Sequence, residues 1–284
     1  MRKSTFALSV VCVMCFPVLA LCQTEQHQLI LSRYESALVS GFPFAFWVEE
    51  RYHRPDPDYL ERDRGWKNPV DGAARSLLHN GLFQDKEKLP QTLSDILRTA
   101  VTLYPLLYFP RQNEPRYEFH SQPFNRLDDA AFFVSYAESQ AVNLLATSLT
   151  KVLARRHRPW VSYRNFDSPF YKGADPATGN QSFFSGHTSA AFAAASFHHR
   201  MLQRFRGKGF GDAEVWGMYL AAALTGLLRI SADKHYLTDV LTGAAVGTLT
   251  AKWVVDISDY EVIGPGAVAN ATAVPVFSFV FRLP

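Results

Sequence analysis

The sequence predicts an all-α fold, because its long apolar stretches carry helical patterns while strand-like composition is confined to the C-terminus. Residues 24–40 place their apolar side chains on one side of a helix. Residues 190–195 are alanine-rich, and alanine has the highest helix propensity. Residues 215–228 and 237–255 are two further apolar stretches that we interpret as helices. By contrast, residues 276–281 are rich in valine and phenylalanine and prefer extended structure.

Further helices are expected along the chain, separated by polar loops that contain proline. Ser94 and Asp95 can cap a helix that continues to residue 107, with Pro105 as a kink or an end. Pro159 marks a helix end, because proline disfavours helical backbone in the residue before it. Gly243 and Gly247 permit close packing of the last helix. The other expected helices cover 72–82, 128–143 and a continuation through Lys151 to His157, with loops at 49–72, 111–126 and 159–182.

The N-terminus predicts export from the cytoplasm. Residues 1–22 resemble a secretory signal peptide, in which Arg2 and Lys3 precede an apolar stretch that Pro17 interrupts. All 3 cysteines lie in this segment, so we expect neither a disulfide nor a cysteine-based metal site in the mature protein. A periplasmic location is therefore expected. An uncleaved membrane anchor, or a lipoprotein cleaved before Cys22, is the alternative.

Composition narrows the class of protein. The chain has 29 Lys and Arg residues against 26 Asp and Glu residues, and leaving out Arg2 and Lys3 lowers the formal net charge from +3 to +1. A charge this small does not favour nucleic acid as a partner. Mean hydropathy is −0.08, and the charge-free run 215–228 is shorter than the roughly 20 residues that cross a bilayer. We expect a soluble or peripheral protein. Its expected segments are the signal peptide 1–22, an N-terminal helical extension 23–92, a core domain 93–258 and a tail 259–284.

One short stretch has the features of an anion-binding site. Ser185, Gly186 and His187 stand directly before the alanine-rich helix. The start of a helix presents free backbone N–H groups and a positive dipole end to an anion. Gly186 lets the backbone approach the anion closely, because it has no Cβ. Taken alone, the same residues fit an ordinary helix cap.

Two other stretches supply charged groups. Lys151 and Arg158 are seven residues apart, about two helical turns, so a helix would place both cations on one face. Further along, Arg229 precedes His235, and Asp239 follows that histidine by four residues. On a helix this spacing would bring the carboxylate beside the imidazole, where it can select the tautomer.

Together the three stretches resemble the signature of the superfamily of type-2 phosphatidic acid phosphatases and vanadium haloperoxidases. That signature reads Lys-x6-Arg-Pro, then Pro-Ser-Gly-His, then Ser-Arg-x5-His-x3-Asp. Order and spacing agree throughout. Phe184 stands where the family usually has proline, and Leu228 where it has serine. The resemblance covers residues 151–239, about the central third of the chain.

The resemblance implies a helical bundle with a phosphate pocket and a phosphatase that needs no metal or other cofactor. His235 is expected to attack phosphorus, His187 to protonate the leaving oxygen, and Asp239 to orient His235. The phosphate would be bound by Lys151, Arg158, Ser185, Gly186 and Arg229. A haloperoxidase that holds vanadate in the same pocket is the alternative. The substrate is expected to be a phosphate monoester, either a lipid phosphate that brings the protein to a membrane surface or a small soluble ester. The sequence determines neither which ester it is nor the oligomeric state.

Overall fold

In a computed structural model of the chain, residues 68–83, 88–108, 126–163, 176–206 and 212–257 are described. Every regular element in these ranges is a helix, so the predicted all-α fold is confirmed. The elements are α3 (Pro69–Arg75), the π-helical turn η1 (Ser76–Asn80), α4 (Lys88–Tyr108), α5 (Arg126–Ala154), α6 (Pro159–Ser162), α7 (Pro176–Gly179), α8 (Gly186–Arg206), α9 (Ala213–Ser231) and α10 (Leu237–Ile257). The signal peptide, the helix expected at 24–40 and the tail 259–284 lie outside the described residues.

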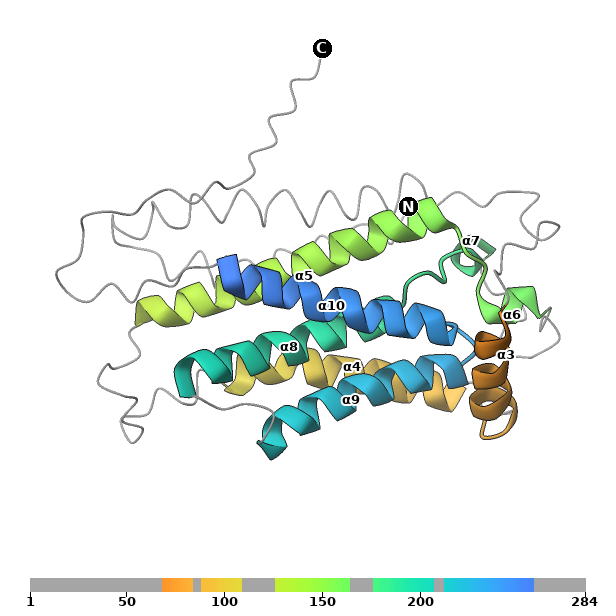
Figure 1. The fold of residues 1–284 in the computed structure, drawn as a ribbon, viewed down its shortest axis with the longest axis horizontal. Helices are drawn as coiled ribbons and strands as arrows, with labels where there is room; N and C mark the ends of the chain where they lie inside the picture. The colour runs from red at the N-terminus through yellow and green to blue at the C-terminus, as the bar shows by residue number, and fades with distance from the viewer. Residues whose placement is uncertain (1–67, 84–87, 109–125, 164–175, 207–211, 258–284) are drawn as a thin grey trace, which may run out of the picture.

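The five long helices form a bundle with α8 at its centre (Figure 1). Helix α8 packs against α4, α5, α9 and α10. Its buried residues include a run of alanines, of which Ala191 and Ala193 are fully buried. Figure 1 shows α3, α6 and α7 gathered at the end of the bundle where α8 and α10 begin and α9 ends. Segments that are far apart in the sequence therefore meet at this end.

Helices α8 and α10 pack closely because α10 carries two glycines on the shared face, as the sequence predicted. A Cβ atom added at Gly243 would lie 2.7 Å from the carbonyl oxygen of Ser185, and one added at Gly247 would overlap that of Ser189. The Ser185 N–H donates to the carbonyl oxygen of Asp239 at 3.1 Å. The start of α8 is thus held directly against the first turn of α10.

Helix α4 is longer than predicted at its start. It begins at Lys88, with Pro90 early in its first turn, so Ser94 and Asp95 lie inside the helix and do not cap it. Pro105 is buried within α4 and does not end it. The expected boundary between the segments 23–92 and 93–258 falls inside this helix.

Helix α5 differs from the prediction in two respects. It is one helix from Arg126 to Ala154, where the sequence suggested two. It also ends before Arg158, because Arg155 adopts a left-handed backbone with φ of 43°. Lys151 therefore lies on the last turn of α5 and Arg158 in the segment that follows, so the two cations do not share a helix face.

The expected loop 49–72 is also wrong at its end, because α3 begins at Pro69. The side chain of Asn68 caps this helix by accepting from the N–H of Asp71 at 2.8 Å, and proline is favoured in the first helical position. The Arg75 guanidinium of α3 donates to both carboxylate oxygens of Asp233 at 2.6 and 2.8 Å. Helix α3 is thereby attached to the segment between α9 and α10.

Candidate active site

The N-terminus of α8 is the centre of the candidate site. Helix α8 begins at Gly186, directly after Ser185, whose hydroxyl oxygen accepts from the Thr188 hydroxyl at 2.9 Å. A Cβ atom added at Gly186 would lie 3.7 Å from Nζ of Lys151. The ammonium group of Lys151 therefore lies beside the first residue of α8. A helix start and a lysine in this arrangement favour an anion.

All three predicted cations act on His235, and two of them, Arg229 and Lys151, also act on His187. Burial lowers the pKa of His235 well below its usual value, and the charges of Arg158, Arg229 and Lys151 lower it further. The pKa of His187 is lowered by burial, by Arg229 and by Lys151 among other positive groups. The cations come from the end of α5, the segment before α6 and the end of α9. The structure thus brings the predicted residues of all three motifs to one place.

His235 is oriented by a main-chain carbonyl. Its Nδ1 is 2.7 Å from the carbonyl oxygen of Ser182, which can only accept, so Nδ1 carries the hydrogen and Nε2 the lone pair. His235 lies ahead of α10, whereas Asp239 lies in its first turn. The Asp239 carboxylate is 3.7 Å from Nδ1, an ion-pair distance too long for a hydrogen bond. The carboxylate lies beside the imidazole as predicted, but His235 is not on the helix, and its hydrogen-bond partner is the carbonyl of Ser182.

His187 meets a carboxylate that the sequence analysis did not assign to the site. Its Nε2 is 2.8 Å from Oδ1 of Asp95, an oxygen that also lies 3.4 Å from Nη1 of Arg229. Asp95 belongs to α4, which packs against both α8 and α9. No motif marked this residue, because only the packing of α4 against the other two helices brings it to His187.

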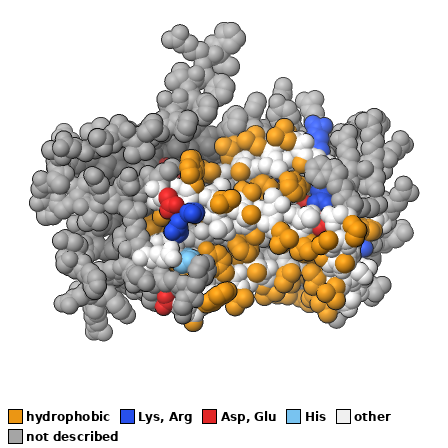
Figure 2. All heavy atoms as spheres, in the orientation of Figure 1, with side chains coloured by type: hydrophobic (Ala, Val, Ile, Leu, Met, Phe, Trp, Pro, Cys, Tyr) orange, Lys and Arg blue, Asp and Glu red, His pale blue; other side chains and the backbone are white. Residues whose placement is uncertain are grey.

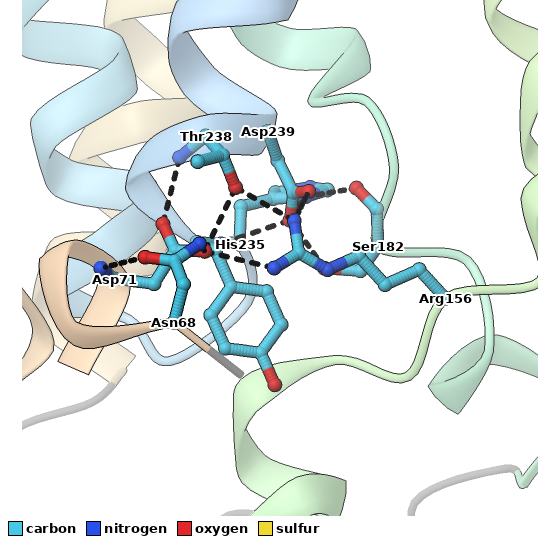
Figure 3. Close-up of polar contacts among 8 residues, drawn as sticks. Asn68, Asp71, Arg156, Ser182, His235, Thr238 and Asp239 are labelled. Carbon is cyan, nitrogen blue, oxygen red and sulfur yellow. Dashed lines mark hydrogen bonds and ion pairs between the residues drawn. The ribbon is translucent and has the colours of Figure 1, made fainter. Parts of the chain in front are cut away.

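Three further residues form a buried polar network behind His235 (Figure 3). Arg156 donates to Asp239 at 2.6 Å and to Asp71 at 2.8 Å. The Ser182 hydroxyl donates to Asp239 at 2.5 Å. Asp71, Arg156 and Ser182 are not among the site residues predicted from the sequence. Arg156 is two residues before Arg158, and that proximity was the only signal in the sequence that could have marked it.

The two departures from the signature lie in the core. Phe184 and Leu228 are both buried apolar side chains. Among the residues that the structure describes, no group of three or more His, Cys, Asp or Glu side chains is placed to hold a metal ion.

A helical bundle that gathers cations and two histidines at the start of one helix has the features of the phosphatase and haloperoxidase superfamily. Residues 132–263 match the family model described as the PAP2 superfamily. The match covers slightly less than half of the chain, and it confirms the recognition from the three motifs.

Two curated proteins are similar to part of the chain. Lipid A 1-phosphatase of Porphyromonas gingivalis is 36% identical over 86 residues, which make up 28% of this chain and 18% of that protein. Lipid phosphate phosphatase 1 of Arabidopsis thaliana is 36% identical over 86 residues, 28% of this chain and 26% of that protein. The chain thus spans about a fifth to a quarter of the length of these relatives. No solved structure matches the chain.

Proposed function

We propose that this protein is a phosphatase that hydrolyses phosphate monoesters, with lipid phosphates as its substrates, through a phosphohistidine at His235. The observation that carries the proposal is the meeting of Lys151, Arg158 and Arg229 with His187 and His235 at the start of α8. Both curated relatives are phosphatases by name, which favours hydrolysis over halide oxidation.

In the first step, Nε2 of His235 attacks phosphorus and the bond from phosphorus to the ester oxygen breaks. His187 gives its proton to that oxygen, which leaves as the alcohol. Burial, followed by neighbouring cations, lowers the pKa of His187, so the histidine loses its proton readily. A bound phosphate dianion opposes this lowering, because its charge offsets that of the cations. Protonation of His187 is then coupled to the arrival of the substrate.

In the second step, His187 takes a proton from water, and the hydroxide attacks phosphorus. The bond between phosphorus and Nε2 breaks, which releases inorganic phosphate and restores neutral His235. In both steps the charge on the equatorial oxygens is stabilised by Lys151, Arg158, Arg229 and the Gly186 amide. These groups supply the countercharge that metal ions supply in other phosphoryl transferases, so the proposed reaction needs no metal.

The surface of the bundle supports a lipid substrate. Helices α9 and α10 carry an apolar face, in which each side chain is between 41% and 62% exposed. Figure 2 shows hydrophobic side chains gathered across this side of the molecule. The apolar face consists of Trp216, Leu220, Leu224, Leu227, Leu241, Leu249 and Trp253. Exposed apolar patches of this kind mark contact surfaces, and we propose peripheral contact with a lipid surface here. No described helix is both long and apolar enough to cross a membrane.

The test is phosphate release from phosphatidic acid in detergent micelles and from p-nitrophenyl phosphate. The phosphoenzyme formed from radiolabelled phosphatidic acid is trapped by an alkaline quench, in which a phosphohistidine is stable. The wild-type protein is expected to release phosphate and to carry label, while His235→Ala does neither, because the nucleophile is gone. His199→Gln, at a histidine on the other half of α8, is the matched control and should label normally. Labelled His235→Ala would mean another nucleophile. Bromide oxidation after addition of vanadate and peroxide, without phosphate release, would favour the haloperoxidase alternative.

A further inference from the structure

Behind His235, one guanidinium group is shared by two buried carboxylates (Figure 3). Nη2 of Arg156 donates to Oδ2 of Asp71 at 2.8 Å, and Nη1 donates to Oδ1 of Asp239 at 2.6 Å. All three residues are at most 2% exposed. The Tyr236 ring packs against the Arg156 guanidinium, with the ring centroid 4.0 Å from Cζ of Arg156. Because Asp71 and Asp239 are acids and Arg156 is a base, the three side chains together have a formal net charge of −1.

Asp71 joins this group from α3, far away in the sequence. Its Oδ1 accepts from the Thr238 N–H at 2.9 Å, and its Oδ2 accepts from the Thr238 hydroxyl at 2.8 Å. The same Oδ2 accepts from Nδ2 of Asn68 at 2.7 Å. Asp71 therefore caps the N-terminus of α10, the helix that carries Asp239, from a separate segment of the chain.

The network continues from Asp239 to the imidazole of His235. Oδ2 of Asp239 accepts from the Ser182 hydroxyl at 2.5 Å and from the Tyr236 N–H at 2.9 Å. The carbonyl oxygen of Ser182 then accepts from Nδ1 of His235 at 2.7 Å. The Ser182 N–H also donates to the carbonyl oxygen of Arg156 at 3.0 Å, so both ends of the Ser182 residue are held by this network.

We propose that Asp71 and Arg156 are positioning residues for His235, which act through Asp239 and Ser182 without touching the phosphate. The inference rests on the proposed phosphatase function. The imidazole becomes positively charged when its Nε2 is phosphorylated, and a fixed negative charge behind Nδ1 stabilises that state. Asp71 lies outside residues 132–263, the range matched by the family model. The working site therefore extends beyond the three motifs and into α3.

Asp71→Asn tests the proposal, because both oxygens of Asp71 accept hydrogen bonds and an amide offers only one acceptor. We expect kcat to fall about 10- to 100-fold, the range seen when partners that orient metal-bound histidines are lost. The inhibition constant of inorganic phosphate should stay within about threefold, since Asp71 does not contact the anion. Asp256→Asn, an exposed aspartate at the end of α10, is the matched control and should leave both quantities unchanged.

Arg156→Gln tests the charge of the same network. Burial raises the pKa of Asp239, and Arg156 is the first group that opposes this. The charged and titratable groups that face Asp239 are Arg156, His235 and Tyr236, with Asp71 on the other side of Arg156. Loss of the guanidinium should move the acidic limb of the kcat profile to higher pH by about one unit. Arg155→Gln, at the exposed neighbouring arginine, should leave the limb in place.

The outcomes separate this inference from the proposed function. A wild-type protein that releases no phosphate overturns both. An active wild type, with kcat and the acidic limb unchanged in folded Asp71→Asn and Arg156→Gln, overturns the positioning role alone. A fall in kcat matched by an equal rise in the phosphate inhibition constant would assign these residues to anion binding and also contradict it. If circular dichroism shows that either variant is unfolded, Thr238→Val decides instead. It should lower kcat in the same direction by a smaller factor, and no change would overturn the proposal.

Discussion

At the scale of single residues, the two histidines differ in the partner that holds each ring. His235 is fixed by a carbonyl oxygen, which accepts at every pH, whereas His187 faces the carboxylate of Asp95. This difference fits the proposed roles, because a nucleophile needs one fixed tautomer and a proton carrier needs to change its charge. The hydrogen-bond partners of the two rings therefore support the proposed roles of the two histidines as much as the rings themselves do.

Lys234 provides a prediction at this scale. Its pKa is lowered to about 7, first by burial and then by Arg158 and Arg229. Below pH 7 the lysine adds a positive charge to the site, and this charge is lost as the pH rises through 7. The KM for p-nitrophenyl phosphate should therefore rise between pH 6 and pH 8 in the wild type. In Lys234→Met the KM at pH 6 should be about fivefold higher than in the wild type, which corresponds to a loss of ~1 kcal/mol in substrate binding. The KM of this variant should also change less between pH 6 and pH 8.

The control for this prediction is Lys252→Met, because Lys252 is exposed on α10 and away from the site. Its KM should follow the wild type at each pH. If Lys234→Met kept the wild-type dependence of KM on pH, the lysine would have no part in anion binding.

At the scale of the elements, the close contact between α8 and α10 positions the site. It holds the start of α8, with Ser185 and Gly186, against the first turn of α10. Helix α3 holds the other side of that turn through Asp71 and, through Arg75, the segment between α9 and α10. The anion-binding turn and the nucleophile thus depend on packing between helices more than on any one helix.

Gly243→Ala is the prediction at this scale. The new Cβ atom would lie 2.7 Å from the Ser185 carbonyl oxygen, so α8 and α10 must separate. We expect a loss of about 1–3 kcal/mol in the free energy of unfolding, measured by urea denaturation, together with a lower kcat.

Gly217→Ala on α9 is the matched control, because nothing lies within 4 Å of its added Cβ atom. Alanine favours the helix there, so this variant should gain up to about 1 kcal/mol and keep its activity. Equal stability of the two variants would contradict the close packing of α8 and α10.

At the scale of the whole molecule, the positions of the site and the apolar face suit the proposed substrate, a lipid phosphate. The cations and histidines meet at one end of the bundle. The apolar face reaches that end at Leu227, near the end of α9, and at Leu241, near the start of α10. These leucines are two residues away from Arg229 and Asp239 along the chain. A lipid phosphate has a charged headgroup and an apolar tail, and the surface offers a region suited to each.

The apolar face can be tested with Leu220→Gln, Leu224→Gln and Leu249→Gln combined in one protein. Binding to phosphatidic acid vesicles, measured by co-sedimentation, should fall about tenfold or more, since each leucine contributes apolar area to the contact. Turnover of p-nitrophenyl phosphate should stay unchanged, because the site is intact. Leu77→Gln with Leu82→Gln, exposed leucines outside the apolar face, is the control. Equal vesicle binding by all three proteins would contradict contact through this face.

The sequence by itself determined the fold class and the family, because both depend on patterns that are local in the chain. Alanine-rich and apolar stretches predicted helices that the structure contains, and the spacing within three motifs identified the superfamily. The same motifs named the residues that the structure brings together at the start of α8. Their proposed catalytic roles stay predictions. The exact ends of α4 and α5 were not predictable, since Pro90 and the left-handed Arg155 act on them through local backbone geometry.

Only the tertiary structure decided which groups hold the two histidines. Asp95 reaches His187 from α4, and Asp71 reaches the network behind His235 from α3. Each lies at least 85 residues from the groups it contacts, where no periodicity or spacing can register the contact. The physical reason is burial: a charge inside the bundle must find its partner wherever the packing places one.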